Sequence, residues 1–313
     1  MKKGKILIIG AGSIGFGWAI KFITHEYEVE IIDSDIERKS FLKNIKSTII
    51  LLNQYGIVKR KYIDIELKIK FLDKLPNDLN DYFHIQECIN ESLVDKKKLY
   101  RNLLCKVNNN TISIASSSSF LTISEIAKDF EKKGQCLVAH PGNPPYLLDV
   151  VEIVPAPFTS KHIIKKLIDI CDNLDMLPIL LKKEKTGFVF NRLQGSILNE
   201  AYNLLNEDVV NPEDIDKIVS NGLGLRWAFF GPFEVFDLNT NGGIEKHAQI
   251  MGPKYKTIAS ERGMEVEHSD NLIKCISNYL KSKYRKESKK NMIKTRDHLL
   301  MSLISLKIKN KIK

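Results

Sequence analysis

Apolar and polar residues alternate along residues 1–155 in short blocks, as they do in a sheet with intervening helices. Residues 5–10 form an apolar run with the length of a strand, residues 13–24 have a helical pattern, and residues 28–33 are again strand-like. Further strand-like runs follow at 83–88, 111–115, 137–140 and 150–154. Strands that alternate with helices in this way predict a mainly parallel, doubly wound α/β sheet.

The pattern changes after residue 186. From residue 193 on, apolar residues recur at the spacing of a helical stripe. Asn211 and Pro212 are typical of a helix cap and first turn, and Gly222 is typical of a helix end. No strand-like run returns in this half of the sequence. We therefore predict an all-helical C-terminal domain over residues 187–313 after an α/β domain over residues 1–186.

Three glycines stand where the first predicted strand passes into the first helix. Gly10, Gly12 and Gly15 form the pattern Gly-x-Gly-x-x-Gly, which permits a tight turn, a close approach of pyrophosphate and close helix packing, respectively. Asp33 ends the next strand, where its carboxylate can accept hydrogen bonds from the adenosine ribose and repel a 2′-phosphate. A glycine-rich turn without a ligand is the alternative. The strand–turn–helix–strand context favours a Rossmann-type domain that binds NAD.

Composition adds few constraints. The 313 residues suffice for two domains, and 43% hydrophobic and 27% charged residues are typical of a globular protein. The five cysteines are scattered without a Cys-x-x-Cys pair, which favours reduced thiols in a cytoplasmic protein and gives no indication of a metal site. The N-terminus resembles a signal peptide, but glycines interrupt its apolar run. No run is long enough to cross a membrane, so we expect no membrane partner.

The net charge of +10 suggests a nucleic-acid partner until it is located along the chain. Residues 271–313 contain 13 Lys or Arg and two acidic residues, so the rest of the chain is close to neutral. The basic stretches KSKYRKESKK and KIKNKIK have almost no aromatic residues and no nucleic-acid-binding motif. We interpret them as a solvated helix face and a frayed tail, and we expect no nucleic-acid partner.

One histidine and one acid flank a proline-rich loop in LVAHPGNPPYLLDVVEIVP, residues 137–155. The prolines exclude a helix, so only a strand–loop–strand path can bring His140 and Glu152 together. An acid inside the apolar run Val-Val-Glu-Ile-Val needs a partner if its strand is buried. A histidine paired with a carboxylate can serve as the base in hydride transfer, and a purely structural pair is the alternative.

Several motifs resemble the 3-hydroxyacyl-CoA dehydrogenase superfamily, and within it the lambda-crystallin or L-gulonate 3-dehydrogenase branch. The similarity extends over nearly the whole chain. It is carried by GAGSIGFGWA, HIQECINESLVDKKKLY, ASSSSF, VAHPGNPPYLLDVVEIVP, GFVFNRLQ, GLGLRWAFFGPFEVFDLN and TRDHLLMSLISLKIKN. The His-Pro-x-Asn-Pro-Pro and Gly-Leu-Gly-x-Arg elements are the most specific of these.

The resemblance implies an NAD-dependent enzyme with named site residues. His140 would be the general base and Glu152 would orient it, while Ser119 and Asn191 would contact the reacting oxygen and the substrate. Beside the three glycines, the residues implied to contact NAD are Ser13, Ile14, Asp33, Glu91 and Lys96. The resemblance also implies a homodimer formed through the helical domain.

Two departures from the acyl-CoA enzymes of this superfamily bear on the substrate. His140 is followed by Pro-Gly-Asn143 rather than by an aromatic pair, so Asn143 lies in a stiffer and more compact loop that we expect to face the substrate. The inserted stretch LRWAFF contains Arg226, whose guanidinium could clamp a substrate carboxylate or only prop the insertion.

The resemblance, together with these departures from the acyl-CoA enzymes, implies NAD-dependent oxidation of the 3-hydroxy group of a small polar hydroxy acid of the L-gulonate type. Oxidation of 3-hydroxyacyl-CoA or of carnitine is the alternative with the same chemistry. A crystallin-like structural role or an NAD-sensing role is the non-enzymatic alternative, but a structural protein has no need for the set of residues around His140.

Overall fold

The computed structural model describes residues 4–58, 68–228, 230–241, 243–261 and 288–309. The chain divides into two units, which are described separately. Unit 1 comprises Met1–Arg192 and Thr295–Lys311, and unit 2 comprises Leu193–Lys294 and Ile312–Lys313. Residues 295–311 thus cluster with unit 1 although they follow unit 2 in the chain. The division into domains at residue 186 stays a prediction.

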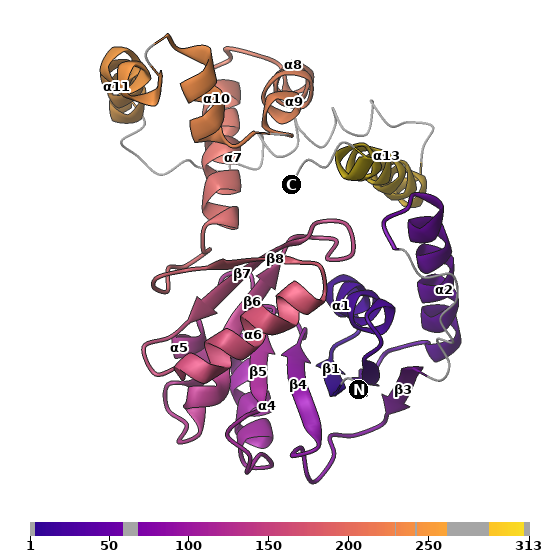
Figure 1. Ribbon diagram of the computed structural model, residues 1–313. Helices are drawn as coiled ribbons and strands as arrows, with labels where there is room; N and C mark the ends of the chain where they lie inside the picture. Colours follow the sequence, from indigo (N-terminus) through magenta and orange to yellow (C-terminus); the bar gives the residue numbers. More distant parts are fainter. Residues whose placement is uncertain (1–3, 59–67, 229, 242, 262–287, 310–313) are drawn as a thin grey trace. The chain divides into compact units, whose positions relative to one another are not determined.

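Unit 1 is built on one eight-stranded sheet with the strand order β3-β2-β1-β4-β5-β6-β7-β8 (Figure 1). All neighbouring strands run parallel except β6 and β7, which are antiparallel. The strands are β1 Lys5–Ile9, β2 Glu28–Ile32, β3 Ile69–Leu72, β4 Tyr82–Glu87, β5 Ser113–Ser116, β6 Cys136–Pro141, β7 Val150–Pro155 and β8 Leu177–Leu180.

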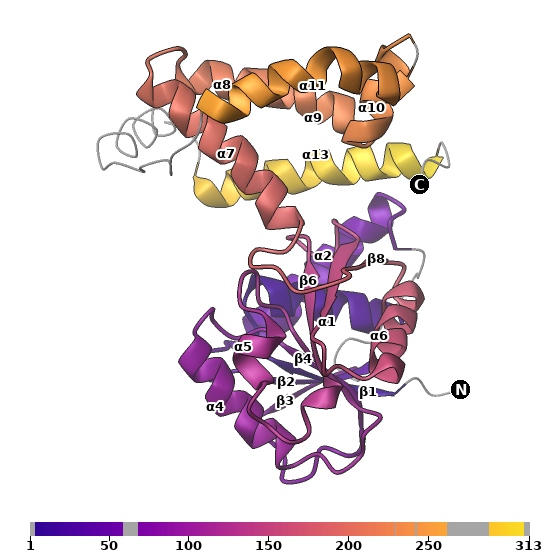
Figure 2. The same cartoon turned by 90° about the vertical axis from the view of Figure 1, so that its left-hand side faces the viewer.

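Helices cover both faces of this sheet (Figure 2). Ile6 and Ile8 of β1 are buried in one core with α1, α2 and α6, whereas Leu7 and Ile9 are buried in a second core with α4 and α5. This alternation confirms the predicted doubly wound α/β fold. The helices of unit 1 are α1 Ser13–Thr24, α2 Arg38–Gln54, α4 Leu93–Leu104, α5 Ile123–Ala127, the short 3-10 helix Lys133–Gln135 and α6 Lys161–Asn173, together with part of α13, Lys289–Lys309.

Two strands, β3 and β8, do not appear among the sequence predictions. They form the two edges of the sheet. Three of the four residues of β8, Leu177, Ile179 and Leu180, are 41–55% exposed on the described surface. An edge strand buries less of each side chain than a central strand does, so its hydrophobic pattern is weak.

The described part of unit 2 is helical, as predicted, and contains no strand. Its elements are most of α7 Phe190–Asn206, α8 Pro212–Ile218, the π-helical turn Val219–Leu223, α9 Gly224–Trp227, α10 Pro232–Asn239 and α11 Gly243–Glu261. Residues 262–287, which include most of the basic stretch KSKYRKESKK, lie outside the described residues, as do residues 310–313 of the tail.

One sequence prediction in unit 2 is wrong. Asn211 and Pro212 do begin α8, but the helix does not end at Gly222. It passes through the π-helical turn into α9, and Gly224 has ordinary helical angles, φ −64° and ψ −45°. Glycine adopts helical and left-handed backbone about equally well, so it permits a helix end without imposing one.

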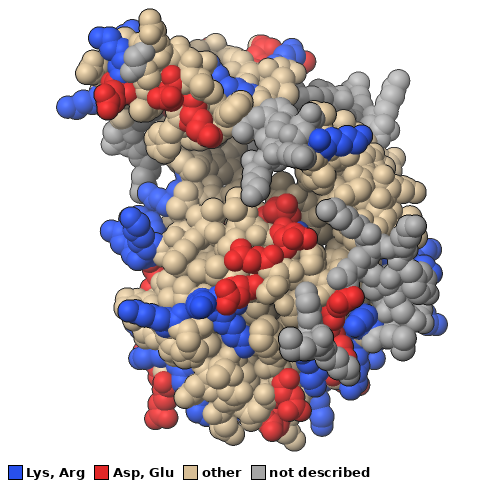
Figure 3. Space-filling model, in the orientation of Figure 1, with Lys and Arg blue, Asp and Glu red and all other residues tan. Residues whose placement is uncertain are grey.

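None of the described helices combines the length and the apolar composition that a membrane crossing requires. On the face of unit 1 drawn in Figure 3, both basic and acidic side chains occur. The cytoplasmic location stays a prediction.

Candidate active site

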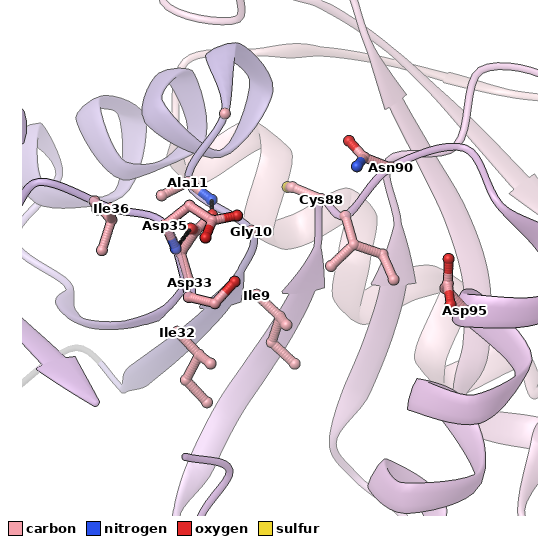
Figure 4. Close-up of a pocket in the computed structure, with 13 residues that line it drawn as sticks. Ile9, Gly10, Ala11, Ile32, Asp33, Asp35, Ile36, Cys88, Asn90 and Asp95 are labelled. Atoms are coloured by element: carbon pink, nitrogen blue, oxygen red, sulfur yellow. Dashed lines mark hydrogen bonds between the residues drawn. The ribbon is translucent and has the colours of Figure 1, made fainter. Parts of the chain in front are cut away.

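The glycine turn between β1 and α1 borders a cavity of about 660 Å³ (Figure 4). A Cβ added at Gly12 would meet no atom within 4 Å, so the backbone faces open space there. Gly10 has φ +96°, and a Cβ on it would lie 2.5 Å from the carbonyl oxygen of Cys88. A Cβ on Gly15 would lie 2.0 Å from the carbonyl oxygen of Gly10. These geometries match the three predicted roles, and the turn fits a dinucleotide pyrophosphate.

Asp33 lies at the rim of the same cavity, just after β2 (Figure 4). Its Oδ2 accepts a hydrogen bond of 2.6 Å from the Ala11 N–H, and its Oδ1 accepts one of 2.9 Å from the Asp35 N–H. The carboxylate is therefore held in place before any ribose arrives. Asp35 also lines the cavity and adds a second negative charge that would repel a 2′-phosphate.

Replacing Asp33 by Ala should weaken NAD binding and relax discrimination against NADP. The substitution removes a charge-assisted acceptor, which contributes about 1.5–3 kcal/mol, so NAD affinity should fall roughly 10- to 100-fold in calorimetry. Asp33→Asn is the matched variant of nearly the same size: it removes the charge and keeps one of the two acceptor oxygens that bind the Ala11 and Asp35 N–H groups. If the unmodified protein prefers NADP, the assignment of Asp33 is wrong.

The other residues predicted to contact NAD lie in different surroundings. Ser13 and Ile14 lie in the first turn of α1, with Ser13 exposed. Lys96 is 1% exposed and donates hydrogen bonds to Glu87 Oε1 at 2.7 Å and to the Ile89 carbonyl at 3.2 Å. Glu87 is fully buried, so the two form a buried ion pair. Sequence reasoning missed Glu87, because β4 reads Tyr-Phe-His-Ile-Gln-Glu and its polar residues hide the burial of the acid that ends it.

Glu91 holds the loop that follows β5. Its Oε1 accepts hydrogen bonds from the Ser118 hydroxyl, from the Phe120 N–H at 3.0 Å and from the Leu121 N–H at 3.2 Å. Burial by itself would raise the pKa of Glu91, but these hydrogen bonds and the Lys96 charge outweigh it and lower the pKa. The carboxylate therefore stays ionised at neutral pH and fixes the serine-rich loop. Its predicted contact with NAD stays a prediction.

A chain of buried polar groups leads to the start of the same loop. The Ser113 hydroxyl lies 2.8 Å from His84 Nδ1, and His84 Nε2 lies 3.0 Å from Gln86 Oε1. The Gln86 amide then donates to Ser117 Oγ at 2.8 Å, and the Trp18 indole N–H donates to the same oxygen at 3.1 Å. Burial lowers the pKa of His84 to about 4, so this histidine is neutral and structural.

His140 and Glu152 meet as the strand–loop–strand path predicts. They are register partners on the antiparallel strands β6 and β7, and His140 Nδ1 lies 2.8 Å from Glu152 Oε2. Both are buried, with 7% of His140 and 3% of Glu152 exposed. An ionised carboxylate only accepts hydrogen bonds, so Nδ1 carries the proton and Nε2 is the basic nitrogen of the neutral imidazole.

Glu152 receives two further hydrogen bonds at the start of α7. Its Oε1 accepts from the Val189 N–H at 2.7 Å and from the Phe190 N–H at 3.0 Å. Burial alone would raise the pKa of Glu152, but the hydrogen bonds from His140 and from these two N–H groups lower it below the ordinary value. The partner of the imidazole is therefore a carboxylate throughout the neutral range.

Ser119 and Asn191 also lie together in unit 1. The Asn191 side-chain amide donates a hydrogen bond of 3.0 Å to the carbonyl oxygen of Ser119, and both residues are half-buried. Asn143 is exposed in the loop after His140.

That loop is seated on α1. A Cβ added at Gly17 of α1 would lie 2.4 Å from Pro145 Cδ, so only a glycine allows this close approach. One turn further along the helix, Lys21 Nζ pairs with Asp149 Oδ1 at 2.7 Å. The helix that begins at the nucleotide turn therefore also supports the loop that carries Asn143.

Arg226 belongs to unit 2, whereas His140 belongs to unit 1. It lies exposed on α9, with its guanidinium carbon 6.0 Å from the ring centre of Phe236. Among the described residues, no group of three or more His, Cys, Asp or Glu side chains could hold a metal ion.

Comparison with known proteins places this geometry in a family. Residues 5–185 match the NAD binding domain of 3-hydroxyacyl-CoA dehydrogenase, and residues 187–269 match its C-terminal domain. The chain is 35% identical to a lambda-crystallin homolog of Homo sapiens, over 80% of this chain and 82% of the relative. It is 30% identical to an L-carnitine dehydrogenase of Oceanobacillus iheyensis, over 96% and 97% of the two chains.

The fold is also shared with a solved structure. The 5-formyl-3-hydroxy-2-methylpyridine 4-carboxylic acid 5-dehydrogenase, an NAD⁺-dependent dismutase, has a TM-score of 0.77 over 97% of each chain at 19% identity.

The protein is therefore an NAD-dependent dehydrogenase. It belongs to the 3-hydroxyacyl-CoA dehydrogenase family, as its motifs predict.

Proposed function

We propose that this enzyme oxidises the 3-hydroxy group of a small polar hydroxy acid of the L-gulonate type. The observation that supports the chemistry is the His140–Glu152 pair, in which Nδ1 is bound at 2.8 Å and Nε2 remains as the base. The similarity to lambda-crystallin homologs over most of the chain supports the branch that the motifs resemble, and the proposed substrate class follows from that resemblance. The L-carnitine dehydrogenase similarity, which covers 96% of the chain, makes carnitine the second candidate.

His140 would take the hydroxyl proton at Nε2 as the substrate carbon loses its hydride. Bound NAD supplies the acceptor for that hydride. Glu152 holds the imidazole in the required tautomer and stabilises the imidazolium that forms. Both residues are more than nine-tenths buried, so the charge that develops on the imidazole lies close to its counter-charge in a poorly solvated site.

Ser119 and Asn191 would stabilise the oxygen that becomes a carbonyl. The Asn191 amide has two N–H groups, of which one donates to the Ser119 carbonyl. That bond orients the amide and leaves its second N–H for the substrate. Asn143, on the exposed loop after His140, would contact the polar part of the substrate.

The substrate proposal is tested by turnover of a panel of free hydroxy acids, carnitine and 3-hydroxyacyl-CoA esters, followed as NADH formation, with Arg226→Lys as the variant. If Arg226 clamps a carboxylate, the lysine loses the planar two-pronged contact. For free hydroxy acids, the kcat/KM of the variant should fall by a factor that corresponds to a loss of roughly 2–4 kcal/mol in transition-state stabilisation. Neutral amide analogues should be poor substrates that the substitution hardly affects.

Arg101→Lys provides the matched control, because Arg101 is exposed on α4 of unit 1. Its kcat/KM should equal that of the unmodified enzyme. Faster turnover of a hydroxyacyl-CoA than of any free hydroxy acid would overturn the proposed substrate, and faster turnover of carnitine would establish the second candidate.

We also propose that the protein is a homodimer through its helical part. Among the described residues of unit 2, Val235 is the one large apolar side chain that is buried. Exposed apolar side chains in the same unit include Leu193, Leu225, Phe233 and Leu238, which are 61–79% exposed. A set of helices this poor in buried apolar surface gains stability by covering it with a second copy.

Light scattering at micromolar concentration should therefore give about twice the chain mass of 35.8 kDa. Phe233→Glu, at the most exposed of these apolar positions, should shift the population towards monomer. Val94→Glu is the control, because Val94 is similarly exposed, at 77%, but lies on α4 of unit 1. A strictly monomeric unmodified protein would contradict the proposal.

A further inference from the structure

Two consecutive residues have left-handed backbone where the chain enters α7. Gly187 has φ +73° and Phe188 has φ +51°. Left-handed backbone is ordinary for glycine and unfavourable for a bulky residue. The other non-glycine residues with positive φ in the described chain, Glu26, Asp175 and Asp208, are all acidic. Phe188 is therefore the one aromatic residue among the described non-glycine residues with positive φ. Backbone strain of this kind persists only where the surrounding structure enforces it, and it is concentrated at functional sites.

The surroundings of Phe188 are those of the catalytic pair. Its side chain is 1% exposed, and its ring centre lies 5.5 Å from that of His140. Its own N–H donates to the Lys185 carbonyl at 2.9 Å, which closes the turn. The two residues that follow, Val189 and Phe190, both direct their N–H groups to Glu152 Oε1. One turn thus touches the imidazole with a ring and the carboxylate with two N–H groups.

We infer that Gly187 and Phe188 are positioning residues for the base: their left-handed backbone aims the Val189 and Phe190 N–H groups at Glu152, which in turn holds His140. Without this turn, Oε1 would lose both donors while buried, and the carboxylate could rotate away from Nδ1. The hydrogen bonds that lower the pKa of Glu152 and keep it ionised then come from His140 first and also from the Phe190 and Val189 N–H groups at the start of α7. The inference rests on the proposed role of His140.

The variant Gly187→Ala tests this inference against the matched control Gly56→Ala. Gly56 has φ +71°, close to that of Gly187, and lies after α2 with no atom within 4 Å of an added Cβ. At Gly187 the nearest atom to an added Cβ is 3.4 Å away, so the added methyl group changes backbone preference more than packing. Both variants should lower the melting temperature to a similar extent.

Only Gly187→Ala should lower kcat, on the order of 10- to 100-fold, because a displacement of about 1 Å costs that much in a positioned site. The acidic limb of its pH–rate profile should move to lower pH, since the imidazolium loses a well-placed counter-charge. NAD affinity should not change. In a Glu152→Ala background, Gly187→Ala should have no additional effect on kcat, because both substitutions act on one contact.

A second readout needs no substrate. A proton on Nδ1 that is bound to a carboxylate gives a far-downfield NMR resonance, which can be assigned by its loss in His140→Ala. The resonance should persist in Gly56→Ala and move upfield or broaden in Gly187→Ala. If the resonance of Gly187→Ala moves while its turnover is unchanged, the turn does position Glu152 and His140, but His140 is not the base of the reaction. If the resonance and the pH profile of Gly187→Ala both match those of Gly56→Ala, the inference is overturned.

Discussion

Replacing His140 by Ala should lower kcat about 10²- to 10⁴-fold, the range that general acid–base groups contribute. The substitution removes Nε2, the nitrogen left free when Nδ1 binds Glu152. Affinity for NAD should be unchanged, because the nucleotide turn and Asp33 lie at the β1–β2 part of the sheet. Steady-state kinetics and calorimetry measure the two quantities separately.

Glu152→Gln should lower kcat less than His140→Ala does, but it should still lower it. A glutamine has one oxygen, whereas Glu152 uses both of its oxygens as acceptors. Either the amide N–H₂ faces Nδ1 and favours the wrong tautomer, or it faces the Val189 and Phe190 N–H groups. The acidic limb of the pH–rate profile should move to lower pH, since a neutral amide stabilises the imidazolium less than a carboxylate does.

His25→Ala is the matched control for both variants. His25 also pairs with an acid, Asp175, at 3.3 Å, but Asp175 is 91% exposed and the pair lies at the C-terminal end of α1. The control should keep the turnover of the unmodified enzyme. Full activity of His140→Ala would exclude His140 as the base.

The second large effect is expected on stability. Lys96→Met should destabilise the folded protein by about 3–5 kcal/mol, because it leaves Glu87 as a buried charge without its partner. The Lys96 and Glu87 side chains are 1% and 0% exposed, and their charged atoms are 2.7 Å apart. Urea denaturation measures the loss.

Lys97→Met is the control in the neighbouring position of the same helix. Lys97 pairs with Asp129 at 3.8 Å, but the two side chains are 37% and 65% exposed, so the loss should be no more than about 1 kcal/mol. The double variant Glu87→Gln/Lys96→Met should recover most of the lost stability. If the double variant also binds NAD normally, Lys96 does not contact the cofactor; equal losses in Lys96→Met and Lys97→Met would contradict the buried-pair argument.

The parts of the fold that could be predicted are those with strong local patterns. The strands β1, β6 and β7 are mostly buried and mostly apolar, so they stand out in the sequence, and α1 follows its glycine turn directly. The edge strands β3 and β8 and the continuation of α8 beyond Gly222 could not be predicted. Their residues are exposed or conformationally permissive, so the local pattern does not select one structure.

Within the candidate site, a buried acid was the most informative local signal. Glu152 lies in an apolar strand, and the need to compensate its charge points to the nearest histidine across one loop. The same reasoning does not extend to Glu87, because His84 and Gln86 precede it in β4 and the strand is not an apolar run. Its partner Lys96 lies on a helix with three consecutive lysines, and the sequence does not say which of them turns inward. The hydrogen-bond donors to Glu91 lie 27 to 30 residues further along the chain, and no local sequence pattern connects them to it.

The sequence by itself determined the doubly wound sheet, the glycine turn with Asp33 and the pairing of His140 with Glu152. Periodicity, turn chemistry and the cost of burying an acid all act within one element or one strand–loop–strand unit. Only the tertiary structure decided that Glu152 is also bound by the turn at Phe188, 36 positions further along the chain. A left-handed conformation at a phenylalanine runs against its local preference, so it can arise only where packing of the whole domain outweighs that preference.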